Sequence, residues 1–296
     1  REFSMNAALS QDERFDNVGA VGQVRWFLRR LQPPEINQTP PRLRYDPESY
    51  DANALGDELR ALELELCDEL SPLPTPEKIP SEVNVIMIYP HRRTGTLGLT
   101  PALARMLPVS EESPRVLVNM IDGQTNESFP VWVLRDGKYL FGLSDFYRRH
   151  RIPIGAYLSI RKTSDPLTFI VNFRAHRART EYIRLAIPNQ GKLRFDNFKR
   201  SIGAEYDELL ILGAEDIDGV DAVWTQSQGR RRKVIDIMSE LVAELGRLNP
   251  QNAVHAKTLY SAVNVVRRCP PGPIFAALAT RSEFRHVGGP YWRLSE

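Results

Sequence analysis

Cysteine is scarce in this sequence. Cys67 and Cys269 are the two among 296 residues, far apart and in unlike contexts. Two such thiols exclude a disulfide scaffold and a cysteine-based zinc site, and they favour a reducing, intracellular compartment. No apolar run approaches the ~18 residues that a membrane-spanning helix requires. The composition therefore excludes a membrane protein and indicates an ordinary globular chain of two or three domains.

Motifs for catalysis and cofactor binding are also absent. The sequence contains no GxxxxGK[ST] loop, no GxGxxG turn and no GxSxG elbow. Glu63 and Glu65 would face apart on a helix, and Asp216 and Asp218 lie in an acidic run without a basic partner. The histidines lack the spacing of a metal site; they are His91, His150, His176, His255 and His286. We therefore expect no catalytic residue, no metal and no cofactor, although an active site assembled from distant residues stays open.

Charge is distributed unevenly along the chain, although the formal net charge is only +2. Residues 1–80 carry 9 Lys and Arg against 15 Asp and Glu, whereas residues 81–190 carry 15 against 9. The last block, 228–296, is basic again, with 11 against 5. Arginine outnumbers lysine 32 to 7, and its planar fork suits phosphates and guanine edges. A GC-rich genome would produce the same bias.

The acidic N-terminal region, residues 5–76, is predicted to contain one amphipathic helix. Leucines recur at helical spacing from Leu55 to Leu70, and acidic residues fill the other faces. This stripe could form a homodimer, or it could pack on its own domain. The second interpretation is favoured because the stripe spans barely two heptads. The prolines of residues 71–76 then predict an extended linker.

Short β-type segments follow one another at close spacing from residue 83 onward. They cover residues 83–89, 115–121, 130–134, 138–141, 156–161, 168–173 and 181–187. Asp136-Gly137 marks a tight hairpin turn between two of them, and one short helix is predicted over residues 144–149. Strands at this spacing with a helix or two predict a compact barrel or sandwich over residues 81–190.

The segments 99–108, 116–119, 122–123, 131–134 and 143–160 follow in an order that resembles the DNA-binding pseudobarrel of plant-specific transcription factors. Specificity domains of some restriction enzymes share that fold. Phe146, Ile152 and Gly155 stand where the family places its helix aromatic, its apolar anchor and the glycine of its final turn. Leu143 and Ala156 depart from the family, in which a tryptophan and an acidic residue are common there. The resemblance covers about a third of the chain.

The resemblance implies that two loop arms read the major groove of DNA. The first, residues 91–96, offers Arg92, Arg93 and Thr94, and the second, residues 135–138, offers Arg135 and Lys138. Such side chains suit contacts with phosphate or guanine. Without the resemblance, both segments are better explained as charged surface loops.

A second basic group follows the arms. It comprises Arg148, Arg149, Arg151, Arg161, Lys162, Arg174, Arg177, Arg179 and Arg184. Basic side chains would lie on both faces of residues 174–179 if these formed a strand, so we expect an exposed loop that contacts a phosphate backbone. The alternative is pairing with the acidic run from Glu205 to Asp221, which lies in a predicted acidic connector, residues 191–227.

The C-terminal region, residues 228–296, shows three helical patterns and then two strands. Helices are expected at about 234–248, 255–267 and 274–280, and the strands flank Gly288-Gly289. This order is typical of a winged helix, and residues 291–294 (YWRL) resemble the end of the HARE-HTH class. The third helix offers almost no side chain for base edges. Phosphate contact or docking of a protein partner is therefore expected instead.

The sequence thus predicts an α+β protein with an acidic helical N-terminal module, a small mainly-β pseudobarrel and a C-terminal winged helix. Its expected function is non-catalytic binding of duplex DNA, as a transcriptional regulator or specificity subunit, in the cytoplasm (nucleoid) of a bacterium or the nucleus of a eukaryote. Two alternatives stay open: a restriction or modification enzyme component with an unrecognised active site, and a protein-interaction adaptor. The candidate DNA-contacting residues are Arg92, Arg93, Thr94, Arg135, Lys138, Arg148, Arg149, Arg177, Arg179, Arg230, Arg231, Arg232, Lys233, Arg267, Arg268 and Arg285.

Overall fold

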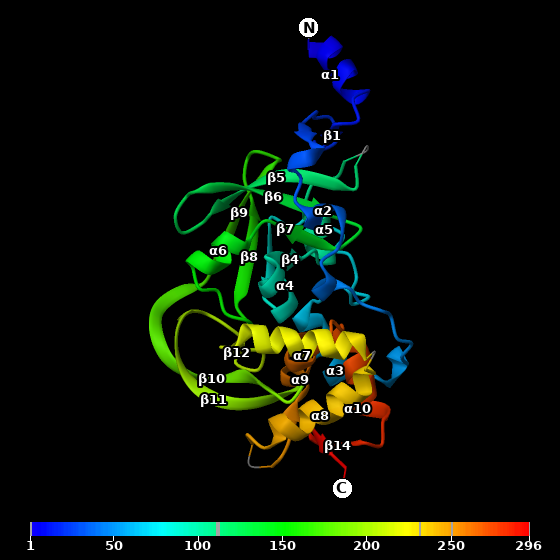
Figure 1. Ribbon diagram of the computed structural model, residues 1–296, viewed down its shortest axis with the longest axis vertical. Coiled ribbons are helices and arrows are strands. Elements are labelled where there is room, and N and C mark those ends of the chain that lie inside the picture. The colour runs from blue at the N-terminus through cyan, green and yellow to red at the C-terminus, as the bar shows by residue number, and fades with distance from the viewer. Residues whose placement is uncertain (1, 111–112, 231, 250, 296) are drawn as a thin grey trace.

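The computed structural model describes residues 2–110, 113–230, 232–249 and 251–295. The chain is a mixed α+β protein. A barrel-like sheet occupies the upper half of the view in Figure 1, and helices of the C-terminal region lie below it. None of the described helices is long and apolar enough to cross a membrane.

The central sheet has seven strands in the order β3-β8-β9-β5-β6-β7-β4 and is nearly closed. The strands are β3 (Glu82–Ile86), β4 (Thr96–Gly98), β5 (Arg115–Asp122), β6 (Ser128–Leu134), β7 (Tyr139–Phe141), β8 (Tyr157–Lys162) and β9 (Thr168–Phe173). β5 and β9 are parallel, and the other neighbours are antiparallel. The short helices of this region are α4 (Tyr89–Thr94), α5 (Pro101–Met106) and α6 (Ser144–Arg149). The predicted barrel is therefore confirmed in this coarse form, except that the strand predicted at residues 181–187 belongs to a separate sheet.

The N-terminal region contributes to two different cores. Val18, Ile36 and Leu43 pack on the outside of the barrel against Leu117 and Trp132. Its elements there are α1 (Glu2–Ser10), β1 (Phe15–Asn17), β2 (Trp26–Leu28), α2 (Pro34–Asn37) and the 3-10 turns η1 (Arg29–Leu31) and η2 (Pro41–Leu43). The segment that follows packs on the C-terminal helices and contains η3 (Ala52–Ala54) and α3 (Asp57–Leu66). Among the described residues, the predicted module 5–76 therefore has no core of its own.

The leucine stripe of this region is buried within the chain itself. Leu55, Leu59 and Leu66 belong to the core of the C-terminal helices and are at most 5% exposed. The helix α3 ends at Leu66, and the next residue, Cys67, adopts a left-handed conformation with a φ of 47°. The stripe therefore packs within the chain, but against the C-terminal helices and not within its own predicted module, and its buried leucines are not free to form a homodimer.

A long antiparallel ribbon follows the barrel and curves around one side of the molecule (Figure 1). It consists of β10 (Ala175–Asn189) and β11 (Lys192–Ala204), and β12 (Leu212–Ala214) pairs with β10 in parallel. Gln190 and Gly191 form its turn with φ values of 48° and 80°, as a two-residue hairpin turn with positive φ at both positions requires. The prediction of a loop over residues 174–179 is wrong, because residues 175–179 belong to a strand. Residues 191–227 are likewise not a simple connector, since they form β11, β12 and α7 (Ile217–Gly229).

The C-terminal region contains α8 (Val234–Gly246), β13 (Val254–His255), α9 (Ala256–Val266), α10 (Pro271–Thr280), β14 (Phe284–Gly288) and β15 (Tyr291–Leu294). Its small sheet has the order β13-β15-β14. The apolar faces that the helical periodicity predicted are buried in one core, which α3, α4, α7 and the inner half of the ribbon complete.

Candidate nucleic-acid interface

The outer half of the β10–β11 ribbon, residues 175–183 and 198–204, exposes cations that are not neutralised by the protein, whereas residues 184–197 form its inner half. Arg177, Arg179 and Lys199 are exposed, and none of them has an acidic partner among the described residues. Two neighbouring cations are paired, since Arg174 contacts Glu205 at 3.1 Å and Arg200 contacts Glu215. The predicted pairing of the basic segment with the acidic run 205–221 thus involves only Arg174 and Arg200. Arg177, Arg179 and Lys199 stay free.

Exposed aromatic side chains accompany these cations. Tyr182 is 68% exposed and Phe198 is 38% exposed. Tyr182 lies opposite Lys199 in the ribbon, and the ammonium group is 5.3 Å from the centre of its ring. Phe198 lies opposite Ile183, on the other face, with the Arg200 guanidinium 5.7 Å from its ring centre. Each face of the ribbon therefore offers a cation beside an aromatic ring.

This arrangement is compatible with contact to a nucleic acid. The major groove of B-DNA admits a two-stranded β-ribbon, unpaired cations attract phosphates, and exposed aromatic rings stack on unpaired bases. Lys199, Tyr182 and Phe198 are not among the residues predicted from the sequence, because the expected connector covers β11 and charge alone does not single out Tyr182. The turn residues Asn189-Gln190-Gly191, followed by alternating apolar and polar residues, are the signal that could have revealed the hairpin.

The first predicted arm is not a loop. Residues 91–94 lie in α4, and the side chain of Arg92 donates from Nε to the Ile152 carbonyl at 2.9 Å. Arg93 is ion-paired with Asp221 of α7 at 2.8 Å, and the Thr94 hydroxyl donates to the Pro90 carbonyl. The expectation that this arm contacts DNA bases is therefore corrected, because its polar groups bind other residues of the protein and hold α4 in place.

The second predicted arm keeps one free cation. Arg135 is partly buried, and its Nη2 donates to the carbonyls of Ala104, Leu107 and Pro108 at the end of α5. Burial lowers the pKa of Arg135. Lys138 is exposed in the hairpin turn between β6 and β7. Arg135 thus fixes α5, and Lys138 alone stays available to a partner.

The cations of α6 are exposed but neutralised. Arg148 pairs with Asp145, and Arg149 pairs with Glu127 and lies 3.4 Å from Asp122. Their net contribution to the positive charge of the surface is therefore small.

The C-terminal candidates divide into buried and exposed groups. Arg268 is fully buried between Asp68 and Glu69, so its prediction as a DNA contact is wrong. Arg232 pairs with Glu240, and Arg267 lies 3.7 Å from Glu48. The exposed candidates without an acidic partner among the described residues are Arg230, Lys233 and Arg285, whereas Arg231 lies outside the described residues.

Helix α10, the third helix of the C-terminal region, is covered by the N-terminal segment. Its residues from Pro271 to Ala276 are buried. A Cβ on Gly272 would lie 2.4 Å from the Tyr50 hydroxyl oxygen and 3.0 Å from Glu63 Oε1. This helix cannot enter a DNA groove while residues 50–63 occupy that position.

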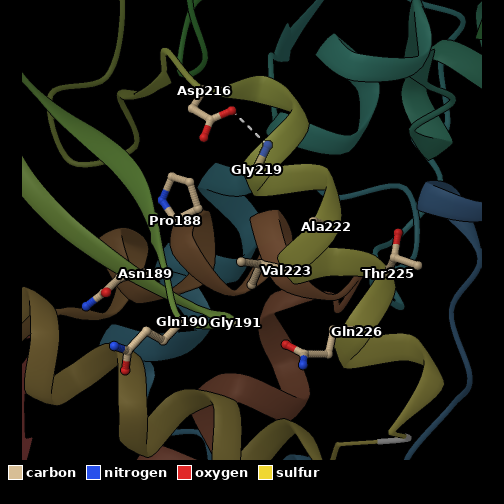
Figure 2. Close-up of a pocket in the computed structure, with 10 residues that line it drawn as sticks. All are labelled: Pro188, Asn189, Gln190, Gly191, Asp216, Gly219, Ala222, Val223, Thr225 and Gln226. Carbon is tan, nitrogen blue, oxygen red and sulfur yellow. Dashed lines mark hydrogen bonds between the residues drawn. The ribbon is translucent and has the colours of Figure 1, made fainter.

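An open cleft beside α7 is a weaker candidate for a functional site. It has a volume of about 720 Å3 and lies between α7 and the turn of the ribbon (Figure 2). Asp216, the cap of α7, accepts a hydrogen bond from the Gly219 N–H at 2.8 Å. No basic residue lines this cleft, and no described group of His, Cys, Asp or Glu side chains has the arrangement of a metal site.

A buried pair of titratable residues ties α6 to the β5–β6 hairpin. His150 Nε2 lies 2.6 Å from Asp122 Oδ2, and the Asp122 side chain is fully buried. Burial alone would raise the pKa of Asp122, but hydrogen bonds from His150 and from the Gln124 N–H lower it below its ordinary value. Because Phe146 and Phe173 pack on the imidazole ring, this pair is a structural clamp.

The clamp predicts a stability difference that depends on pH. Asp122→Asn should lower the free energy of unfolding at pH 7 by about 1–3 kcal/mol, because a buried ionic hydrogen bond is removed. A carboxylate with a depressed pKa stabilises the fold above its unfolded pKa of about 4, and this contribution disappears as pH falls through the folded value. Urea unfolding of both proteins at pH 7 and pH 3 measures the difference. Exposed Asp145→Asn is the control, and an equal effect at both pH values would contradict the assignment.

Comparisons with protein-family models, with curated proteins and with solved structures find no match to this chain.

Proposed function

We propose that this protein binds duplex DNA without catalysis and that the outer half of the β10–β11 ribbon is its principal contact surface. The observation that carries the proposal is the set of three exposed cations, Arg177, Arg179 and Lys199, which lack acidic partners among the described residues. A transcriptional regulator or a specificity subunit is the class of protein that this activity fits.

The arrangement of the other regions supports the same proposal. The nearly closed sheet with α5 and α6 between its strands is compatible with a plant-type DNA-binding pseudobarrel. Gly155, placed by the resemblance at the final turn, has a φ of 85°, which glycine adopts most readily. In the C-terminal region, the order α8-β13-α9-α10-β14-β15 and the sheet order β13-β15-β14 favour a winged helix. With α10 covered, we assign the winged helix a supporting role through Arg230, Lys233 and Arg285.

The test is binding of the whole chain to a labelled mixed-sequence duplex across a salt series, measured by fluorescence anisotropy. The variant Arg177→Ala/Arg179→Ala/Lys199→Ala should bind more weakly than the unmodified protein. Its plot of log affinity against log salt should be flatter by about 0.9 for each phosphate that the variant no longer neutralises. The matched control is Arg30→Ala/Lys78→Ala/Arg105→Ala, which removes the same charge from exposed residues elsewhere.

Two outcomes would contradict the proposal in different ways. Equal weakening in both triple variants would show that net charge, and not the ribbon, determines affinity. No binding by the unmodified protein at low salt would reject DNA as the partner, and the free cations would then be assigned to docking of an acidic protein.

A further inference from the structure

A small polar cavity lies where the inner half of the ribbon meets the C-terminal region. Its volume is about 110 Å3. The polar residues that line it are Arg184 and Asn197 of the ribbon, Asn249, His255 and Thr258 of the C-terminal region, and Tyr291 of β15. No carboxylate lines it. The cavity differs in kind from the exposed DNA surface, since its walls come from two packed parts of the chain.

Arg184 brings to this cavity a positive charge that no ion pair among the described residues neutralises, although the charge of nearby Asp207 partly offsets it. Its Nη2 donates to the carbonyls of Glu208 and Leu209 at 2.7 and 2.9 Å. Its Nε is buried without a hydrogen-bond partner, and no carboxylate pairs with it among the described residues. Burial lowers the pKa of Arg184, yet an arginine stays protonated in proteins. A partly buried cation whose hydrogen-bond partners are carbonyls is stabilised further by an anion.

His255 supplies a second hydrogen-bond donor. The side chain is 7% exposed, and its Nδ1 accepts the Lys257 N–H at 3.0 Å. The ring proton is therefore on Nε2, which can act as a donor to a ligand. Burial and the nearby charge of Lys257 lower the pKa of His255 to about 4, so the ring is neutral at pH 7. The nearby charged groups are Arg184, Lys257, Asp207 and Glu65, and Lys257 is paired with Asp207 and Glu65.

Thr258 adds an acceptor to these donors. Its hydroxyl proton is donated to the Leu209 carbonyl at 2.8 Å, which leaves lone pairs on Oγ1. Asn249 likewise donates its amide protons to the carbonyls of Leu245 and Ala253. A ligand that fits this cavity accepts hydrogen bonds from Arg184 and His255 and donates one to Thr258 Oγ1. An oxyanion that carries both O⁻ and O–H groups on its central atom meets these requirements. Hydrogen phosphate has both, whereas sulfate at neutral pH has no proton to donate.

We propose that this cavity binds one hydrogen phosphate group between Arg184 and His255, either as the free ion or as the singly protonated end of a phosphate monoester. The volume corresponds to roughly three or four waters at about 30 Å3 each, which accommodates one tetrahedral oxyanion and excludes a whole nucleotide. Because the walls join the ribbon to α9 and β15, the bound ion stabilises their contact. The proposed phosphate site is independent of DNA binding, and the experiment that tests it uses no DNA.

The test is thermal unfolding of the full chain with increasing sodium phosphate at pH 7 and constant ionic strength. The melting temperature should rise with phosphate by mass action, and sulfate should have a smaller effect. Isothermal titration with inorganic phosphate and with glycerol phosphate then distinguishes the two sources. Binding of the inorganic ion alone assigns the free ion, whereas equal binding of both probes shows that the site also accepts the end of a monoester.

Two variants make the test specific. Arg184→Gln should bind phosphate at least about tenfold more weakly, because a charge-assisted hydrogen bond is removed. His255→Asn keeps a side-chain cap for α9 but has no Nε2 donor, so it should also weaken binding even if the first variant unfolds. Exposed Arg194→Gln, which does not line the cavity, is the matched control. Equal phosphate effects in all four proteins, or equal shifts with sulfate, would overturn the proposal.

Discussion

Arg268→Ala is expected to lower the free energy of unfolding by about 3–5 kcal/mol, because it leaves two buried carboxylates without their cation. Arg268 Nη2 lies 2.5 Å from Asp68 Oδ1 and 2.7 Å from Glu69 Oε1, and the arginine and Asp68 side chains are fully buried. The guanidinium also donates from Nη1 to Asn264 Oδ1 at 3.0 Å. Carboxylates at such depth are shielded from bulk solvent, so surface hydration does not compensate for the missing cation.

Residues around the cluster of Arg268, Asp68 and Glu69 increase the expected loss of stability. Tyr260 donates to Asp68 Oδ2 at 2.5 Å, and His91 Nε2 lies 3.2 Å from Glu69 Oε1. Burial alone would raise the pKa of Glu69, but Arg268 and His91 hold it well below its ordinary range. The cluster therefore joins the segment after α3, the helix α4 and the C-terminal helices, and removing the cation disturbs all three.

Urea unfolding, followed by circular dichroism, measures the effect of Arg268→Ala. Arg281→Ala is the control, because Arg281 is exposed and such a change is within about 0.5 kcal/mol. The triple variant Arg268→Met/Asp68→Asn/Glu69→Gln should recover part of the stability, since no unpaired charge is left buried. A decrease below about 1 kcal/mol for Arg268→Ala would show that the carboxylates reach water or another cation.

The parts of the fold that depend on local sequence could be predicted. The predicted ranges of α6 and β9 coincide with the observed elements, and α8 to α10 follow from apolar periodicity. Long-range pairing could not be predicted from the same patterns. Asp68 and Arg268 are 200 residues apart, and nothing in either local sequence indicates that they meet.

The free cations of the ribbon could be predicted only in part, because long-range pairing decides which cations are free. Arg177 and Arg179 were identified from charge alone, but a basic side chain can equally cap a helix or pair with an acid. Arg135 does the first and Arg93 does the second. Lys199 was missed because its exposure depends on the pairing of β11 with β10. Tertiary contacts thus decide which of many arginines are free.

Phe275→Ala is expected to lower the free energy of unfolding by about 3–5 kcal/mol, as for other buried phenylalanines. Phe275 is fully buried in α10. Its core also contains Leu59 of α3, Phe195 of β11 and Val220 of α7. A cavity at this position therefore weakens the packing of segments that the sequence assigned to three different modules.

The same variant tests whether these segments unfold together. If they share one core, Phe275→Ala should move a single transition, and tryptophan fluorescence and circular dichroism should report the same midpoint. Phe198→Ala makes the same chemical change at a residue that is 38% exposed, so it should cost less than about 1 kcal/mol. Two separated transitions, with only one displaced, would instead show that residues 228–296 unfold independently. One cooperative transition would mean that the ribbon and α3 depend on α10 for their packing, because a shared core cannot lose one wall without exposing the others to water.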